Sequence, residues 1–160
     1  MKRGALFALL VAGCGAGNSL EGSLSDQVSL AFDEVQVQRS ATALAVAYLR
    51  SPPGGGGKDT VLKVVAATEG LDLARGLTID LTQKLADGTT VRGSFTRAVS
   101  GDARRDFPPL VRGLIRFDGA PALGAKVSGS FSALFAQGGS VGAGRTAFGD
   151  FSAGVTEAGQ

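Results

Sequence analysis

Short segments in which apolar and polar residues alternate recur along this chain, and they constrain its fold more than any other feature. Leu77, Ile79 and Leu81, for example, alternate with polar neighbours. Successive side chains of a β-strand point to opposite faces of the sheet, so this pattern is typical of a half-buried strand. The segments that we expect to form strands are 28–37, 41–50, 61–67, 77–81, 90–98, 110–117, 126–135 and 146–155. Their regular spacing predicts an all-β fold, a single antiparallel β-sandwich or β-barrel of about 7–9 short strands.

Two of the expected strands are irregular. Residues 28–32 place their apolar side chains on one face, and the apolar phase then slips by one residue. A slip of this kind predicts a β-bulge at Asp33-Glu34. The alanines of residues 41–50 would also suit a helix, although apolar residues at every second position favour a strand.

Glycine, proline and aspartate mark the connections between the expected strands. Asp87-Gly88 lies between two alternating segments, where it predicts a hairpin turn with both central residues at positive φ. Residues 51–57 combine prolines with a run of glycines and therefore predict a surface loop. A phosphate-binding loop is the alternative, but Asp59 follows Lys58 where that motif has serine or threonine, and no helix pattern comes after it.

A pattern of glycine, any residue, phenylalanine and serine or threonine begins at Gly93, Gly129 and Gly149. In each copy the glycine and the phenylalanine fall on the same face of an expected strand. We expect these glycines to admit an aromatic ring from a neighbouring strand, or to allow the sheet to coil sharply. A repeated binding motif is the less favoured alternative, because such repeats are ordinary in β-rich folds.

The N-terminus has the layout of an export signal. Lys2 and Arg3 form a short positive region, and residues 5–12 form an apolar run. This order of charge and apolar run is typical of a secretory signal peptide. A transmembrane helix needs about 20 apolar residues, so the run is too short to span a bilayer.

The apolar run ends in Val11-Ala12-Gly13-Cys14. This motif resembles the lipobox of bacterial lipoproteins, with valine where leucine is commonest. In that family the cysteine sulfur receives a diacylglyceryl group, signal peptidase II cleaves before the cysteine, and the new amino group is often acylated. The resemblance implies that Cys14 is the lipidated first residue of the mature protein. A plain secretory signal with a chance cysteine, or a buried apolar strand, is the alternative.

Lipidation would attach the chain to a membrane through Cys14, since two or more acyl chains anchor a protein stably. Gly15 stands where aspartate holds some lipoproteins at the inner membrane, so the resemblance favours the outer membrane of a bacterial cell envelope. Leu20 and Leu24 could begin a short helix, but the surrounding glycines and serines favour a flexible linker. The expected parts are a signal peptide at 1–13, the lipidated cysteine and flexible linker at 14–25, and an all-β domain at 26–160.

The charge of the chain argues against nucleic-acid binding. The sequence has 16 Lys and Arg and 14 Asp and Glu side chains, and loss of Lys2 and Arg3 with the signal peptide leaves 14 of each sign. A neutral body lacks the basic field that holds nucleic acid. The single cysteine excludes an intramolecular disulfide and a cysteine-based metal cluster.

The residue types that most catalytic sites need are missing. The chain has no histidine, and its one cysteine is Cys14, so Ser-His-Asp and Cys-His arrangements are excluded. Paired carboxylates remain, as in glycoside hydrolysis. The candidates are Asp33, Glu34, Asp80, Asp102, Asp106, Asp118 and Asp150. Most fall in expected turns or on polar faces, so we predict a non-enzymatic protein without a cofactor or metal. Residues 102–106 are expected to form an exposed loop, and a binding loop is the alternative.

These observations support three functions in decreasing order. The first is a lipid-anchored envelope lipoprotein whose β-domain is structural or contacts an envelope protein. The second is a β-barrel-like module that binds an apolar small molecule or lipid. It requires a cavity lined by Phe95, Phe131, Phe135 and Phe151, and rings that fill the core would exclude it. The third is a carboxylate-dependent hydrolase, which needs two acids facing each other at roughly 5–10 Å.

Overall fold

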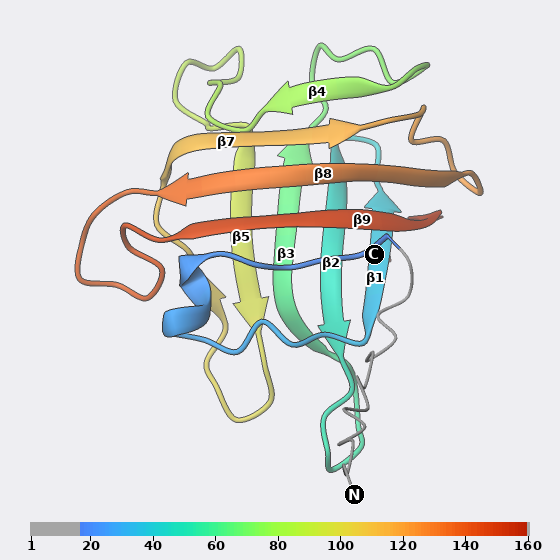
Figure 1. Cartoon of the computed structure of the whole chain (residues 1–160). Coiled ribbons are helices and arrows are strands. Elements are labelled where there is room, and N and C mark those ends of the chain that lie inside the picture. Colours follow the sequence, from blue (N-terminus) through green and yellow to red (C-terminus); the bar gives the residue numbers. More distant parts are fainter. Residues whose placement is uncertain (1–16, 160) are drawn as a thin grey trace, which may run out of the picture.

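The computed structural model describes residues 17–159, which form an all-β domain (Figure 1). The predicted all-β fold is confirmed. The expected signal peptide and Cys14 lie outside the described residues. The elements are the 3₁₀-helix η1 (Ser23–Asp26) and the strands β1 (Glu34–Arg39), β2 (Ala43–Arg50), β3 (Asp59–Ala67), β4 (Leu77–Asp80), β5 (Gly93–Ala98), β6 (Arg105–Asp106), β7 (Leu110–Phe117), β8 (Lys126–Phe135) and β9 (Thr146–Glu157).

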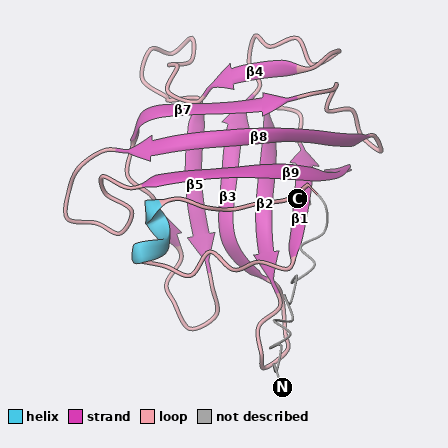
Figure 2. Cartoon of the chain, viewed as in Figure 1, coloured by secondary structure: helices cyan, strands magenta, loops and turns pink. Residues whose placement is uncertain are grey.

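The nine strands of the described chain belong to one curled sheet, in the order β4-β7-β8-β9-β1-β2-β3-β5-β6. Figure 2 shows that β7, β8 and β9 cross in front of β1, β2, β3 and β5, so that the sheet folds into two layers. Neighbouring strands are antiparallel except β1 and β9, which pair in parallel from Val37 and Val155 to Arg39 and Glu157. The expected purely antiparallel sheet is therefore mixed, because alternation specifies the face of a strand and not its partner.

On one side, Leu81 bridges the two layers. Its backbone N–H donates to the carbonyl of Gly113 over 2.8 Å, and its carbonyl accepts the N–H of Gly93 over 2.9 Å. The side chain of Leu81 is buried, and a Cβ atom on Gly93 would lie 2.5 Å from the Cβ of Leu81. Glycine at positions 93 and 113 therefore lets β5 and β7 approach the bridging leucine closely.

On the other side, residues 17–32 fill the space where β9 and β1 diverge. Ser19 and Asp150 exchange two backbone hydrogen bonds, and so do Glu21 and Phe148. Residues 17–21 thus run antiparallel along β9 before η1, as the blue segment of Figure 1 shows. The N-terminal segment is part of the sheet's hydrogen-bonding pattern.

The predicted flexible linker is wrong for residues 17–25. Leu20 and Leu24 are buried in the core, and Leu24 belongs to η1, so the alternative of a short helix is correct around this residue. The glycines and serines resemble a linker in composition, but burial of two leucines outweighs the flexibility that they provide. The folded domain already includes residue 17, whereas the sequence placed its start at 26.

Most of the predicted strands are confirmed, and two of them, 110–117 and 126–135, match β7 and β8 residue for residue. Residues 41–50 form a strand, β2, rather than a helix. Residues 28–32 lie outside the strands, so the bulge predicted at Asp33-Glu34 is wrong. Their alternation instead comes from packing of the apolar side chains against the core.

The turn at Asp87-Gly88 is confirmed, but its geometry and its partners differ from the prediction. Gly88 has a φ of 72°, and no described residue other than glycine has a positive φ. The Asp87 carboxylate accepts the N–H groups of Thr89 and Thr90, each over 2.8 Å. The strand before this turn, β4, pairs with β7 and not with β5, because Leu81 takes the chain from one layer to the other.

The repeated glycine and phenylalanine pattern builds the aromatic core. The register of β8 and β9 places Gly129 opposite Phe151 and Phe131 opposite Gly149. A Cβ atom on Gly129 would lie 2.5 Å from the Phe151 ring. Each glycine therefore leaves the space that the ring across the ladder occupies. The expectation that these glycines admit a neighbouring ring is confirmed for this pair of strands, whereas Gly93 admits Leu81.

Candidate functional site

The seven carboxylates considered for catalysis lie in separate local contacts. Six have these partners: the Ser51 N–H for Asp33, Lys58 for Glu34, Thr82 for Asp80, Arg105 for Asp102, Arg116 for Asp118 and Ser19 for Asp150. Asp106 is exposed on β6. None of these contacts joins two of the carboxylates. Within residues 17–159, no group of three or more Asp, Glu, His or Cys side chains could hold a metal ion.

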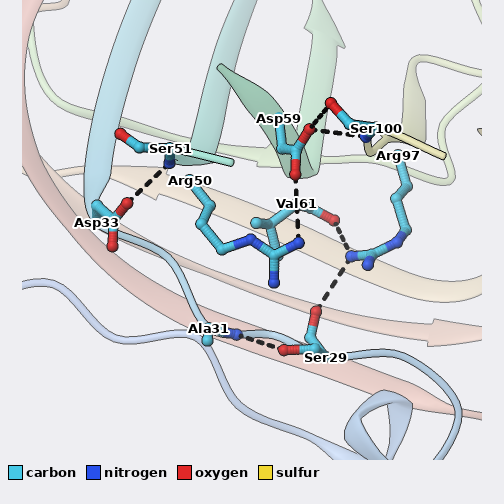
Figure 3. Close-up of polar contacts among 9 residues, drawn as sticks. All are labelled: Ser29, Ala31, Asp33, Arg50, Ser51, Asp59, Val61, Arg97 and Ser100. Atoms are coloured by element: carbon cyan, nitrogen blue, oxygen red, sulfur yellow. Dashed lines mark hydrogen bonds and ion pairs between the residues drawn. The ribbon is translucent and has the colours of Figure 1, made fainter. Parts of the chain in front are cut away.

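The two most buried charged side chains of the described chain, Asp59 and Arg97, belong to a cluster that the sequence did not predict, at the end of β2, the start of β3 and the end of β5. We call Arg50, Asp59, Arg97 and Ser100 the Asp59 cluster (Figure 3). The Asp59 side chain is 4% exposed. One of its oxygens accepts both the N–H and the hydroxyl of Ser100, each over 2.7 Å. The other oxygen accepts a hydrogen from Arg50 Nη2 over 3.2 Å.

These contacts determine the protonation of Asp59. Donation from the Ser100 hydroxyl and amide holds the pKa of the carboxyl below its usual range, and Arg50 acts in the same direction. A carboxylate with a low pKa and with both oxygens engaged is a weak proton acceptor. Asp59 therefore joins the strand ends to the loop that carries Ser100, and it is not arranged as a general base.

Arg97 is the second buried charge of the Asp59 cluster. Its side chain is 5% exposed, and Nη1 donates to the carbonyls of Ser29 and Val61 over 3.1 and 3.0 Å. Its Nε has no hydrogen-bond partner among the described residues. Burial lowers the pKa of the Arg97 guanidinium. The side chain thus fastens the segment before β1 to β3 (Figure 3).

The alternation of β5 and β3 contains the signal that could have revealed this cluster. Arg97 follows Phe95 by two residues, and Asp59 precedes Val61 by two, so both charges share a face with a core residue. The structure buries all four side chains. A charge in phase with core residues is the pattern to search for, because it must find partners inside the fold.

A surface depression of about 570 Å³ lies beside the start of β2, the end of β3 and the start of β5, at the opposite ends of these strands from the Asp59 cluster. Its lining includes Arg92, which is 7% exposed. Arg92 Nη1 donates to the carbonyls of Ala67 and Glu69, and Nε donates to Gln83. The buried cation of the depression is therefore already engaged by groups of the protein itself.

The four phenylalanines expected to line an apolar cavity fill the core instead. Each of them is at most 3% exposed. The ring centroid of Phe95 lies 5.8 Å from that of Phe131 and 5.3 Å from that of Phe135, and Phe151 lies 5.2 Å from Phe117. These are contact distances between aromatic rings. The rings therefore pack against one another in the core, and Phe95 also borders a surface depression of about 400 Å³.

The outward face of the front layer carries two exposed apolar side chains. Leu114 of β7 is opposite Ser132 of β8, which in turn is opposite Phe148 of β9. Leu114 is 48% exposed and Phe148 is 43% exposed. The two side chains share this face, on either side of Ser132.

The chain has no significant match among protein-family models, curated proteins or solved structures. Among residues 17–159, no helix has the length and apolar content that a membrane crossing requires. Cys14, the site residue predicted from the sequence, lies outside the described residues, three positions before Gly17.

Proposed function

We propose that this protein is a lipid-anchored lipoprotein of a bacterial cell envelope whose β-domain works without catalysis, as a structural or protein-interaction domain. The observation that carries the proposal is the order of three features at the N-terminus: the charges of Lys2 and Arg3, the apolar run 5–12, and the small residues before Cys14. Each feature alone is common, and their conjunction is typical of a lipoprotein signal. The absence of aspartate at position 15 favours the outer membrane.

The start of the described chain supports an anchored domain. Ser19 and Glu21 are hydrogen-bonded to β9, so the fold begins within a few residues of Cys14. Three residues span at most about 11 Å when fully extended. A lipid on Cys14 would therefore hold the domain against the membrane surface and not on a long tether.

The state of the polar groups supports a role without catalysis. Both oxygens of Asp59 are engaged in the Asp59 cluster, and Nη1 of Arg97 donates to backbone carbonyls. The remaining candidate carboxylates lie in separate local contacts. Exposed Leu114 and Phe148 instead favour contact with another protein of the envelope.

Intact mass spectrometry of the membrane fraction tests the anchor. We expect the mature chain to start at Cys14 and to carry the added mass of a diacylglyceryl or triacyl modification. The Cys14→Ala variant should lack this species. The double variant Cys14→Ala, Ser25→Cys is the control, because it restores an exposed cysteine outside the motif. An unmodified soluble wild-type chain, or lipid on the double variant, would contradict the proposal.

Crosslinking in cells tests the interaction surface. A photoreactive amino acid at Phe148 should give a discrete crosslinked product with an envelope protein, because this position is 43% exposed on the outward face. Val91 is 41% exposed elsewhere and provides a matched control position. Equal products from both positions would indicate unspecific collisions, and no product from Phe148 would argue against a partner on this face.

A further inference from the structure

The connection between β7 and β8 presents an apolar loop at one end of the domain. Residues 119–125, which we call the Leu123 loop, contain no charged side chain. Leu123 is 56% exposed, one of the two most exposed large apolar side chains of the described chain. The neighbouring Ala122 and Gly124 are exposed as well. An exposed leucine flanked by small residues suits an apolar environment better than water.

The Leu123 loop is held in a fixed shape. Arg39 Nη1 donates to the carbonyl of Pro121 over 3.0 Å, and the Gly124 N–H donates to the carbonyl of Val155 over 2.9 Å. The loop also has an internal hydrogen bond from the Ala125 N–H to the Ala122 carbonyl. Because these contacts are preformed, the loop needs little ordering when it binds a surface.

The N-terminal segment leads toward this loop. Residues 17–21 run antiparallel to β9, from Glu21 beside Phe148 back to Gly17 beside Ser152. At Gly17 the described segment therefore runs toward the end of β9 that contains Val155. In Figure 1 that end of the sheet also holds the connection from β7 to β8.

Two lengths allow the anchor to lie at the level of the Leu123 loop. Cys14 is three residues from Gly17, which limits their separation to about 11 Å. Ser152 is three strand residues from Val155, which corresponds to about 10 Å along β9. The anchor can therefore reach the level of Gly124, whereas Thr146, at the other end of β9, is six strand residues, or about 20 Å, from Ser152.

We propose that the Leu123 loop inserts into the interface of the lipid bilayer beside the anchor, and so fixes the orientation of the domain on the membrane. This inference rests on the proposed lipidation of Cys14. Leu123 contacts the boundary between headgroups and acyl chains. Lys126, which is exposed directly after the loop, contacts the phosphate groups of the lipids. The lipid surface is thus a second binding partner of the folded domain, apart from the acyl chains.

Tryptophan fluorescence tests this orientation directly, because the chain contains no tryptophan. Leu123→Trp places a single probe in the loop. Val111→Trp is the matched control, since Val111 is also 56% exposed but lies at the start of β7, at the opposite end of that strand from the loop. Both full-length variants are expressed with their lipid, checked by intact mass, and reconstituted into phosphatidylethanolamine and phosphatidylglycerol vesicles with brominated acyl chains.

We expect emission from L123W to shift to the blue and to lose roughly half of its intensity to bromine quenching, because interfacial insertion reaches about 5–10 Å. Emission from V111W should not change. Lipidated L123W that remains unquenched would overturn the orientation and leave the anchor intact. Equal quenching of both variants would overturn it too, since it would mean that no particular end faces the membrane. A chain without lipid mass would refute the proposed function itself.

Discussion

Two regions of the domain are stabilised in different ways, one by close packing of apolar groups and the other by hydrogen bonds to buried charges. Between β8 and β9, Gly129 and Phe151 fit together by shape alone, as do Gly149 and Phe131. In the Asp59 cluster, by contrast, Asp59 and Arg97 are buried with hydrogen bonds to both oxygens of Asp59 and from Nη1 of Arg97. Nε of Arg50 and Nε of Arg97 have no hydrogen-bond partner within residues 17–159. We expect added side-chain volume in the first region, and loss of a hydrogen bond in the second, to lower the free energy of unfolding. Four variants, in order of decreasing effect, test this difference.

The largest effect is expected from Gly129→Ala. Its new methyl group would collide with the backbone carbonyl of Arg116 and with the Phe151 ring, neither of which can move without disturbing a strand. We expect a loss of roughly 3 kcal/mol or more in the free energy of unfolding, measured by denaturant titration. Gly154→Ala, also in this pair of strands, is the control, because nothing lies within 4 Å of its Cβ position. Similar losses for the two variants would show that packing is not the cause.

Arg97→Met tests the polar region and should cost about 2 kcal/mol. The substitution keeps most of the side-chain volume but removes the donor to the part-buried carbonyl of Ser29 and to the buried carbonyl of Val61. The exposed Arg104 provides the control, and Arg104→Met should change stability by less than about 0.5 kcal/mol. If Arg97→Met left the free energy of unfolding unchanged or raised it, the desolvation cost of the buried guanidinium would equal or exceed the stabilisation from its hydrogen bonds.

Tyr48→Phe removes one hydrogen bond from the aromatic region and should cost about 1 kcal/mol. The Tyr48 hydroxyl donates to the carbonyl of Asp150 over 2.9 Å, and its ring is fully buried. Burial raises the pKa of Tyr48, so stability is retained below its ordinary pKa of 10.0 and is lost as pH rises above that value. Tyr48 is the one tyrosine of the chain, and alkaline absorbance titration reads it directly. Ionisation of the folded protein near pH 10 would contradict this burial.

Ser100→Ala should have the smallest effect, visible mainly in acid. The pKa of Asp59 lies below its ordinary value of 3.8, so the carboxylate stabilises the fold above that pH and loses its contribution as pH falls through the folded pKa. Removal of the Ser100 hydroxyl should raise the pKa of Asp59 and move the acid loss of stability to higher pH. Carboxyl NMR titration measures the shift, and an unchanged Asp59 pKa would refute the role of the hydroxyl. Asp87, held in its own turn with a pKa of about 2, serves as an internal reference.

The same contrast explains how much of the fold could be predicted from the sequence. Strands such as 110–117 and 126–135 were predictable, because alternation is a local pattern and the inward face of each strand follows it, although Leu114 interrupts it on the outward face of β7. The Gly129 and Phe151 pair was predictable in kind for the same reason. The parallel pairing of β1 with β9 could not be predicted, because the two strands are distant in sequence and no local sequence pattern indicates which strands pair.

The N-terminal segment and the Asp59 cluster were missed for related reasons. The composition of residues 17–25 is that of a linker, and only the long-range burial of Leu20 and Leu24 reveals its place in the core. Taken singly, Arg97 and Asp59 resemble surface charges. Their burial becomes evident only when one notes that each shares a strand face with a core residue and that β3 pairs with β5. In both cases tertiary contacts override a compositional signal.

If the domain is anchored as we propose, the order of the sheet has a consequence for copies crowded on a membrane. Its two outermost strands are β4, with 4 residues, and β6, with 2 residues. Sheets that offer long unpaired edges recruit strands from neighbouring copies, and very short edges prevent this. Confinement to a surface would raise the local concentration of the domain and with it the frequency of encounters between edges. The truncated outer strands therefore protect closely packed copies of the domain from aggregating edge to edge.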